Sequence, residues 1–220
     1  LSEIDWLPEL YPSAEITGRV VHELLEKYCV KTELSEVKLL FVAPLPPAQL
    51  ETVKPVHTLE DLKGMKIVAE GKVDSWTVEA LGATPVAISM AEVYTSLERG
   101  LVEGTTLIWE GVLAFRAHEV TKYRTGCNLF CRAFPVIMNL DVWNSLPSDI
   151  QKAFEECSGV EASTRFGAAF DAADKGAMGA IMDYDKNVGN PGIYFLPEAE
   201  RDRWMESLST VWDKWVEEKE

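Results

Sequence analysis

The stretch from Thr58 to Trp109 constrains the fold more than any other part of the chain, because short strand, helix and turn patterns follow one another in it with little loop between them. Two capping patterns mark helix starts, Thr58 with Asp61 and the S-x-x-E pattern of Ser89 with Glu92. Strands alternating with short helices predict an α/β fold in which ligands bind near the carboxyl ends of the strands. The strands are expected at 65–69, 84–88 and 101–108, with glycines 64, 82 and 100 ending the helices.

The rest of the chain adds a buried strand and two long helix patterns. The apolar run 37–43 predicts a strand buried on both faces, and 129–139 predicts a further extended segment. Residues 148–187 carry one apolar stripe over about 40 residues, which predicts a helix long enough to brace two lobes. A last amphipathic helix follows Pro197, and its tryptophans fall near one face, which favours packing over ligand binding.

Composition excludes several classes of function. A formal net charge of -15 disfavours a nucleic-acid or anionic-membrane surface, because such surfaces need clustered Lys and Arg. Charged or polar residues interrupt every apolar run that approaches membrane-spanning length. The opening LSEIDW has neither an initiator Met nor a signal-peptide pattern, which indicates a processed product or a fragment and leaves the compartment open.

No catalytic or metal motif is recognisable. The chain lacks G-x-S-x-G, H-E-x-x-H and P-loop patterns, and its 36 Asp and Glu residues are too many for one pair to be chosen as acid and base. Its four cysteines form no C-x-x-C pair, so we expect no metal site. Without a recognisable catalytic motif, we also expect no enzymatic activity and no cofactor. A disulfide between Cys127 and Cys131 would require a bent loop between them and stays open.

The central stretch resembles the DctP-type solute-binding proteins of TRAP transporters. The resemblance rests on ordered motifs and continues downstream through HEVTKY at 118–123, Trp143 and Leu146-Pro147. It covers essentially all 220 residues, whereas members of this family usually have about 300. The missing portion would be the N-terminal one. The motifs are TLEDLKGMKI at 58–67, LGATPV at 81–86 and EVYTSLERGLVEG at 92–104.

The resemblance implies a periplasmic receptor of two α/β lobes that closes over a small organic ligand and delivers it to the small and large membrane subunits of the permease. One lobe is expected to contain 44–125, the remainder is expected in the other lobe, and the helix 148–187 is expected to span both. We expect a monomer that does not itself span a membrane. The free energy for closing the lobes must come from contacts with the ligand that are more favourable in the closed state than in the open state.

In carboxylate-binding members of this family, the ligand anion meets two arginines and an asparagine. In this chain the corresponding positions are Val68, Ala48 and Leu107, so the usual anchor is absent. A buried carboxylate without a cation is strongly destabilised. Met90 and Trp109 would make the pocket more apolar still, which predicts a hydrophobic or aromatic ligand. Any carboxylate would be held by another group such as Arg132, or by an arginine in the missing N-terminal part.

Glu70, after the strand that contains Val68, is a candidate acceptor for a ligand amine or hydroxyl. Each assignment has a plainer alternative. Val68, Met90 and Leu107 would also suit an ordinary core, and Glu70 and Arg132 a solvated surface. A ligand-sensing domain of a signalling protein on the same fold is the alternative function, and an enzyme on a similar scaffold is a third.

Overall fold

In the computed structural model, which describes residues 4, 7, 8 and 10–219, the chain divides into two compact units. Unit 1 is built mainly from residues 10–47 and 130–172, and unit 2 mainly from 48–129 and 173–220. Helices and mixed sheets alternate along the chain, so the predicted α/β class is confirmed. The expected lobe containing 44–125 stays a prediction.

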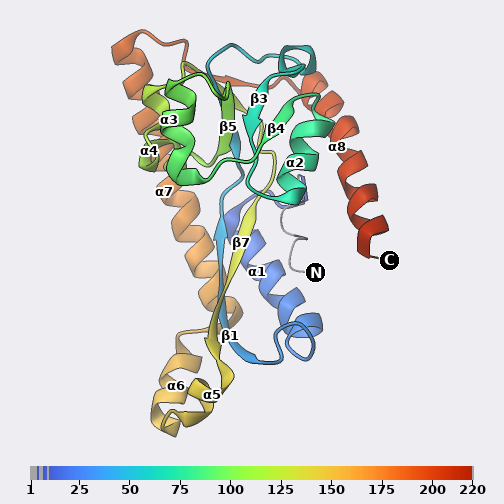
Figure 1. Ribbon diagram of the computed structural model, residues 1–220. Coiled ribbons are helices and arrows are strands. Elements are labelled where there is room, and N and C mark those ends of the chain that lie inside the picture. Colours follow the sequence, from blue (N-terminus) through green and yellow to red (C-terminus); the bar gives the residue numbers. More distant parts are fainter. Residues whose placement is uncertain (1–3, 5–6, 9, 220) are drawn as a thin grey trace. The chain divides into compact units, whose positions relative to one another are not determined.

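Unit 2 is organised around a six-stranded mixed sheet in the order β4-β3-β5-β2-β6-β8. Figure 1 labels three of these strands, β3, β4 and β5. β3 pairs in parallel with β4 and β5, β2 runs antiparallel to both β5 and β6, and β8 is parallel to β6. The strands are β2 Gln49–Thr52, β3 Lys66–Val68, β4 Thr84–Val86, β5 Gly104–Leu107, β6 Tyr123–Gly126 and β8 Ile193–Phe195.

Short helices connect these strands, as the alternating pattern predicts. The capping box of Thr58 and Asp61 is confirmed, because the Asp61 carboxylate accepts from the backbone N–H of Thr58 at 2.9 Å. The short helices of unit 2 are the 3-10 turns η3 Leu59–Leu62, η4 Met90–Glu92 and η5 Ala117–Glu119, with α2 Lys72–Ala80, α3 Val93–Glu98 and α4 Trp109–Ala114. The longer helix α8, Glu198–Lys219, follows the last strand.

The S-x-x-E prediction was wrong in its geometry. The Ser89 hydroxyl donates to the Glu92 carboxylate at 2.8 Å, and the Ser89 side chain makes no capping bond to the backbone at this helix start. A 3-10 turn intervenes before α3, so the two side chains satisfy each other instead of the orphan N–H groups.

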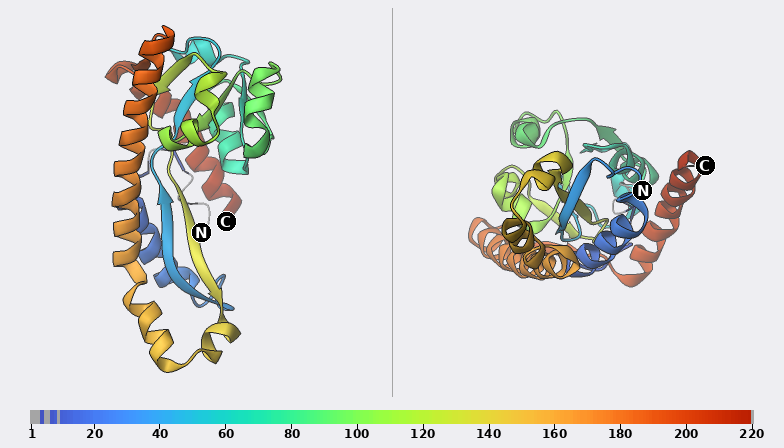
Figure 2. Two further views of the ribbon diagram at one scale, coloured as in Figure 1. Left: turned by 90° about the vertical axis from the view of Figure 1, so that its left-hand side faces the viewer. Right: turned by 90° about the horizontal axis from the view of Figure 1, so that it is seen from below.

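Unit 1 contains a two-stranded antiparallel sheet of β1 Val37–Leu45 and β7 Arg132–Asn139, which lie side by side in Figure 2. Its core packs α1 Ala14–Leu24 and the π-helical turn η2 Leu25–Cys29 against one face of the strands. Burial alternates along β1, so the prediction of a strand buried on both faces was wrong. An antiparallel pair can leave its other face partly open.

The predicted helix of about 40 residues is two helices. α6 spans Ser148–Glu156 and α7 spans Gly159–Val188, after α5 Leu140–Ser145. Gly159 has a φ of 84°, a left-handed conformation that an α-helix cannot continue through. The apolar stripe runs across the break, which is why periodicity alone merged the two helices.

The four cysteines all lie in the described part of the chain, and no disulfide joins any of them. Among the described residues, no helix combines the length and apolar character that membrane crossing requires.

Replacing Gly104 tests the packing at the centre of the unit 2 sheet. Gly104 pairs with Thr52 on β2 and Ile67 on β3, and an added Cβ would lie 2.7 Å from the Glu51 carbonyl oxygen. We expect Gly104→Ala to lower the free energy of unfolding by about 1–3 kcal/mol in urea titrations.

Gly176→Ala is the matched control, because nothing lies within 4 Å of a Cβ at this exposed position of α7. It should raise the free energy of unfolding by about 0.5–1 kcal/mol through helix propensity. Equal stability of Gly104→Ala and the unsubstituted chain would contradict the close approach of the strands.

Candidate functional site

The candidate site lies at one edge of the unit 2 sheet, which we call the carboxyl edge. Parallel β3, β4 and β5 end there, after Val68, Val86 and Leu107. β2 runs the other way and starts at this edge, with Gln49 opposite Leu107. The carboxyl ends of strands are the usual ligand-binding edge of open α/β sheets, because the loops that follow them can approach a ligand.

Three predicted ligand-binding residues, Val68, Leu107 and Trp109, belong to one buried apolar cluster, and Met90 packs against it partly buried. Val68 is 1 % exposed and Trp109 is 5 % exposed. They therefore form an apolar support beneath the carboxyl edge. Their direct contact with a ligand stays a prediction.

Glu70 connects the loops that follow β3 and β4. Its side chain is exposed, and its carboxylate accepts a hydrogen bond from the Met90 backbone N–H at 3.0 Å. The bond fixes the backbone of Met90 relative to the end of β3. Glu70 therefore has a structural role at this edge beside its predicted role as an acceptor for a ligand.

Trp109 begins α4, and the next residue is held by a carboxylate from α7. The Glu110 N–H donates to the Asp174 side chain at 2.8 Å, and Asp174 is 6 % exposed. A buried carboxylate at this position satisfies one of the otherwise unpaired N–H groups of the first turn. It thereby fixes where α4 starts, and with it the backbone of Trp109.

Gln49 makes a side-chain lock that sequence reasoning missed. It is 3 % exposed, and its Oε1 accepts from the backbone N–H groups of Cys127 at 2.9 Å and Asn128 at 3.0 Å. Its Nε2 donates to Asn128 Oδ1 at 2.7 Å. Asn128 has a φ of 50°, so the lock holds a left-handed turn after β6. Buried Ala48 lies beside it, and its carbonyl accepts from the Leu129 N–H at 2.9 Å.

Arg132 belongs to unit 1, where it starts β7. It is partly buried, and its guanidinium carbon lies 5.2 Å from the centroid of the Phe130 ring. Stacking on an aromatic ring helps to orient a guanidinium. Arg132 is therefore a partly buried cation in contact with the Phe130 ring.

A cavity of about 150 Å³ in unit 2 lies among β6, β8 and the loop before η3, and none of the seven predicted residues lines it. Its walls carry the His57 and Tyr194 rings, whose centroids are 4.3 Å apart. Its lining residues are Val56, His57, Tyr123, Arg124, Thr125, Pro191, Gly192, Ile193 and Tyr194.

The lock at Gln49 can be tested by Gln49→Leu, which keeps the side-chain bulk but removes the acceptor for two backbone N–H groups. Leaving buried donors unsatisfied should lower the free energy of unfolding by about 1–3 kcal/mol. Gln151→Leu is the control, because Gln151 Nε2 only donates to the Trp143 carbonyl near the surface. Equal losses in the two variants, measured in urea, would argue against the lock.

Comparison with known proteins places the chain in a family. Residues 8–219 match the family described as bacterial extracellular solute-binding protein, family 7, or DctP. The C4-dicarboxylate-binding periplasmic protein DctP of Rhodobacter capsulatus is 29% identical over 164 residues, which are 74% of this chain and 48% of that protein. The chain therefore spans about half the length of this curated relative.

Two solved structures share the fold at somewhat lower identity. A TRAP solute binding protein from Rhodoferax ferrireducens, in complex with copurified benzoate, matches with a TM-score of 0.90 and 26% identity, covering 98% of this chain and 67% of that one. A marine metagenome TRAP solute binding protein from an unidentified microbe, described as specific for aromatic acid ligands and bound to 3-hydroxybenzoate, has a TM-score of 0.89 and 25% identity, covering 99% and 68%.

The family match spans nearly the whole chain, and the fold agrees with solved TRAP solute-binding proteins, which are two-lobed receptors. The chain belongs to family 7 of the bacterial extracellular solute-binding proteins, the DctP family.

Proposed function

We propose that this chain captures a small aromatic or otherwise hydrophobic carboxylate in the periplasm and delivers it to the membrane subunits of a TRAP permease, without chemical turnover. The apolar carboxyl edge of unit 2 is the observation that carries the proposal. Val68 and Leu107 stand where the family resemblance implies polar anchors, and they form one buried cluster with Trp109. Such an edge offers apolar contact to an aromatic ring, but it offers few polar groups that could bind a second carboxylate.

Two neighbours at 25–26% identity support an aromatic ligand. One was found with copurified benzoate, and the other is described as specific for aromatic acids. The curated relative from Rhodobacter capsulatus carries a C4-dicarboxylate name instead, at 29% identity over part of the chain. The competing ligand class is therefore a dicarboxylate, and the two classes differ by one negative charge.

The single carboxylate of an aromatic acid still needs a cation, because a desolvated anion without a partner is strongly unfavourable. Arg132 is our proposed partner. Its aromatic support on Phe130 limits the rotamer entropy that binding would cost. Met90 is only partly buried, and we propose that it makes the apolar contact with the aromatic ring of the ligand. The other predicted apolar residues are buried and would support this contact: Ala48, Val68, Leu107 and Trp109. Glu70 would instead accept from a ligand hydroxyl.

Calorimetric titration separates these ligand classes. We expect the protein to bind benzoate more tightly than succinate by about tenfold or more, because the apolar edge leaves a second carboxylate unpaired. Arg132→Gln should weaken benzoate binding by about 10- to 100-fold, as loss of a charge-assisted hydrogen bond does.

Arg99→Gln is the matched control, since it removes one exposed cation at the end of α3 and should leave benzoate affinity within about twofold. Tighter binding of succinate than of benzoate would exclude an aromatic acid as the ligand. An unchanged benzoate affinity in Arg132→Gln would remove Arg132 from the site while leaving the ligand class standing.

A further inference from the structure

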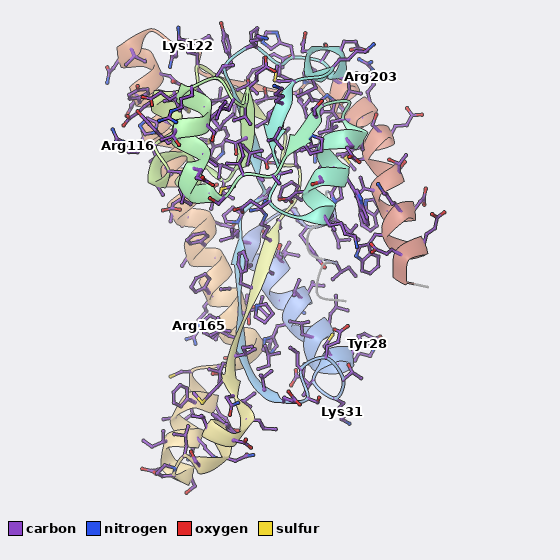
Figure 3. The ribbon with its side chains drawn as sticks, viewed as in Figure 1. Tyr28, Lys31, Arg116, Lys122, Arg165 and Arg203 are labelled. Atoms are coloured by element: carbon purple, nitrogen blue, oxygen red, sulfur yellow. The ribbon has the colours of Figure 1, made fainter. Side chains whose placement is uncertain are left out.

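A cluster of three buried ionisable side chains lies in unit 2, apart from the carboxyl edge. Glu51 comes from β2, Arg124 from β6 and Asp185 from the last turn of α7. The side chains of Glu51 and Arg124 are 0% exposed and that of Asp185 is 1% exposed. By contrast, Arg116 and Arg203 lie at the surface, where water screens their ion pairs (Figure 3).

The guanidinium of Arg124 joins the two carboxylates. Its Nη1 lies 3.0 Å from Asp185 Oδ1, its Nε lies 3.5 Å from Glu51 Oε2, and its Nη2 donates to the His118 carbonyl at 3.1 Å. The last turn of α7 is thereby attached to two adjacent strands of the sheet.

The charges within this cluster do not balance. Two carboxylates share one guanidinium, so full ionisation would leave a net negative charge on side chains that are almost fully buried. Such a charge is strongly disfavoured, and proteins usually avoid it by binding a proton. One of the two carboxyl groups is therefore expected to be neutral.

Hydrogen bonding identifies which carboxyl group takes the proton. Asp185 Oδ1 accepts from Asn190 Nδ2 at 3.0 Å in addition to its close contact with Arg124. Within the described residues, Glu51 Oε1 and Asp185 Oδ2 both have no hydrogen-bond partner, and Glu51 Oε2 lies 3.2 Å from the Thr121 hydroxyl. That hydroxyl is 2.9 Å from the Ala117 carbonyl, so it can donate its one hydrogen there while its oxygen accepts a hydrogen bond from a protonated Glu51.

We propose that Glu51 is a buried proton-binding site, neutral at pH 7, whose ionisation in mild alkali weakens the attachment of α7 to the unit 2 sheet. The occupant is a single proton shared within the Glu51, Arg124 and Asp185 cluster. This inference does not depend on which ligand the protein carries.

The electrostatics of the cluster agree with this assignment. Burial raises the pKa of Glu51 to about 8, against the lowering effects of Arg124 and of a hydrogen bond from Thr121, and the nearby Asp185 raises it further. The ionisable or charged groups that face Glu51 are Arg124 from β6 and Asp185 from α7, while Thr105 opposite it on β5 and Thr121 are neutral. His118, on η5, contributes its backbone carbonyl and turns its ring edge towards Tyr184 at 4.8 Å.

The consequence for stability has a definite sign. A carboxyl whose pKa is raised on folding binds more protons in the folded state than in the unfolded state. Its contribution to stability is complete below its ordinary value of 4.5 and is lost progressively as the pH rises to about 8. The free energy of unfolding should therefore fall as the pH rises from 6 to about 8, and level off above that.

Carbon-13 NMR of protein labelled at the glutamate carboxyl carbons tests the proposal without any substitution. We expect one glutamate resonance to titrate with a midpoint near pH 8 and to be absent from Glu51→Gln. In Asp185→Asn, Arg124 would serve Glu51 alone, so the midpoint should fall by about one pH unit or more. The proposal is overturned if every glutamate titrates below pH 6, or if Asp185→Asn leaves the midpoint in place.

Urea unfolding between pH 6 and pH 9 provides the second readout. The midpoint urea concentration of the unsubstituted protein should fall over this range, whereas that of Glu51→Gln should stay nearly flat. Glu119→Gln is the matched control, because it removes a carboxylate paired with exposed Arg116 and should keep the pH dependence. Parallel profiles for the unsubstituted protein and Glu51→Gln would exclude a proton at Glu51.

Discussion

The pairing of β5 between β3 and β2 is the constraint on which unit 2 depends. β5 is parallel to β3 and antiparallel to β2, and Gly104 allows both neighbours to approach closely at its start. The other end of the same strand places Leu107 opposite Gln49 and leads directly into Trp109 and α4. The register of one four-residue strand therefore positions both the core and the candidate site.

Polar side chains hold the backbone of the loops at the carboxyl edge of unit 2, while the residues buried beneath this edge are apolar. Gln49 holds the turn after β6, Glu70 holds the Met90 backbone, and Asp174 holds the start of α4. Each bond satisfies a backbone N–H that would otherwise be costly to bury. The loops at the carboxyl edge are thus held by hydrogen bonds in the structure without a ligand, which would reduce the ordering cost if the proposed ligand binds there. The Glu51, Arg124 and Asp185 cluster connects the last turn of α7 to the same sheet by charge.

Local features of the fold could be predicted from the sequence, and features that join distant segments could not. The Thr58 and Asp61 cap and the alternation of strands with short helices follow from residues a few positions apart. The break at Gly159 was missed because the apolar stripe continues on both sides of it. Ser89 and Glu92 have the spacing of a capping box, but a 3-10 turn begins between them. The two side chains therefore bond to each other and not to the backbone N–H groups that a capping box would satisfy.

The residues of the candidate site divide in the same way into those that could be predicted from the sequence and those that depend on contacts between distant segments. Val68 and Leu107 could be proposed because the family resemblance identifies their positions, and Trp109 because it follows Leu107 closely; all three belong to one buried cluster. Gln49 and Asn128 are 79 positions apart, and Glu51 and Asp185 come from different elements joined through Arg124. No short-range pattern marks such pairs, because their chemistry exists only after the strands have taken their register.

A retention experiment tests the ligand class most directly. The purified protein is equilibrated with equal concentrations of benzoate, 3-hydroxybenzoate and succinate, separated rapidly from free ligand, denatured, and assayed by mass spectrometry for the acids that it retained. The account predicts that an aromatic acid is retained in preference to succinate, because the apolar edge formed over Val68, Leu107 and Trp109 favours a ring. Preferential retention of succinate, or of none of the three acids, would contradict it.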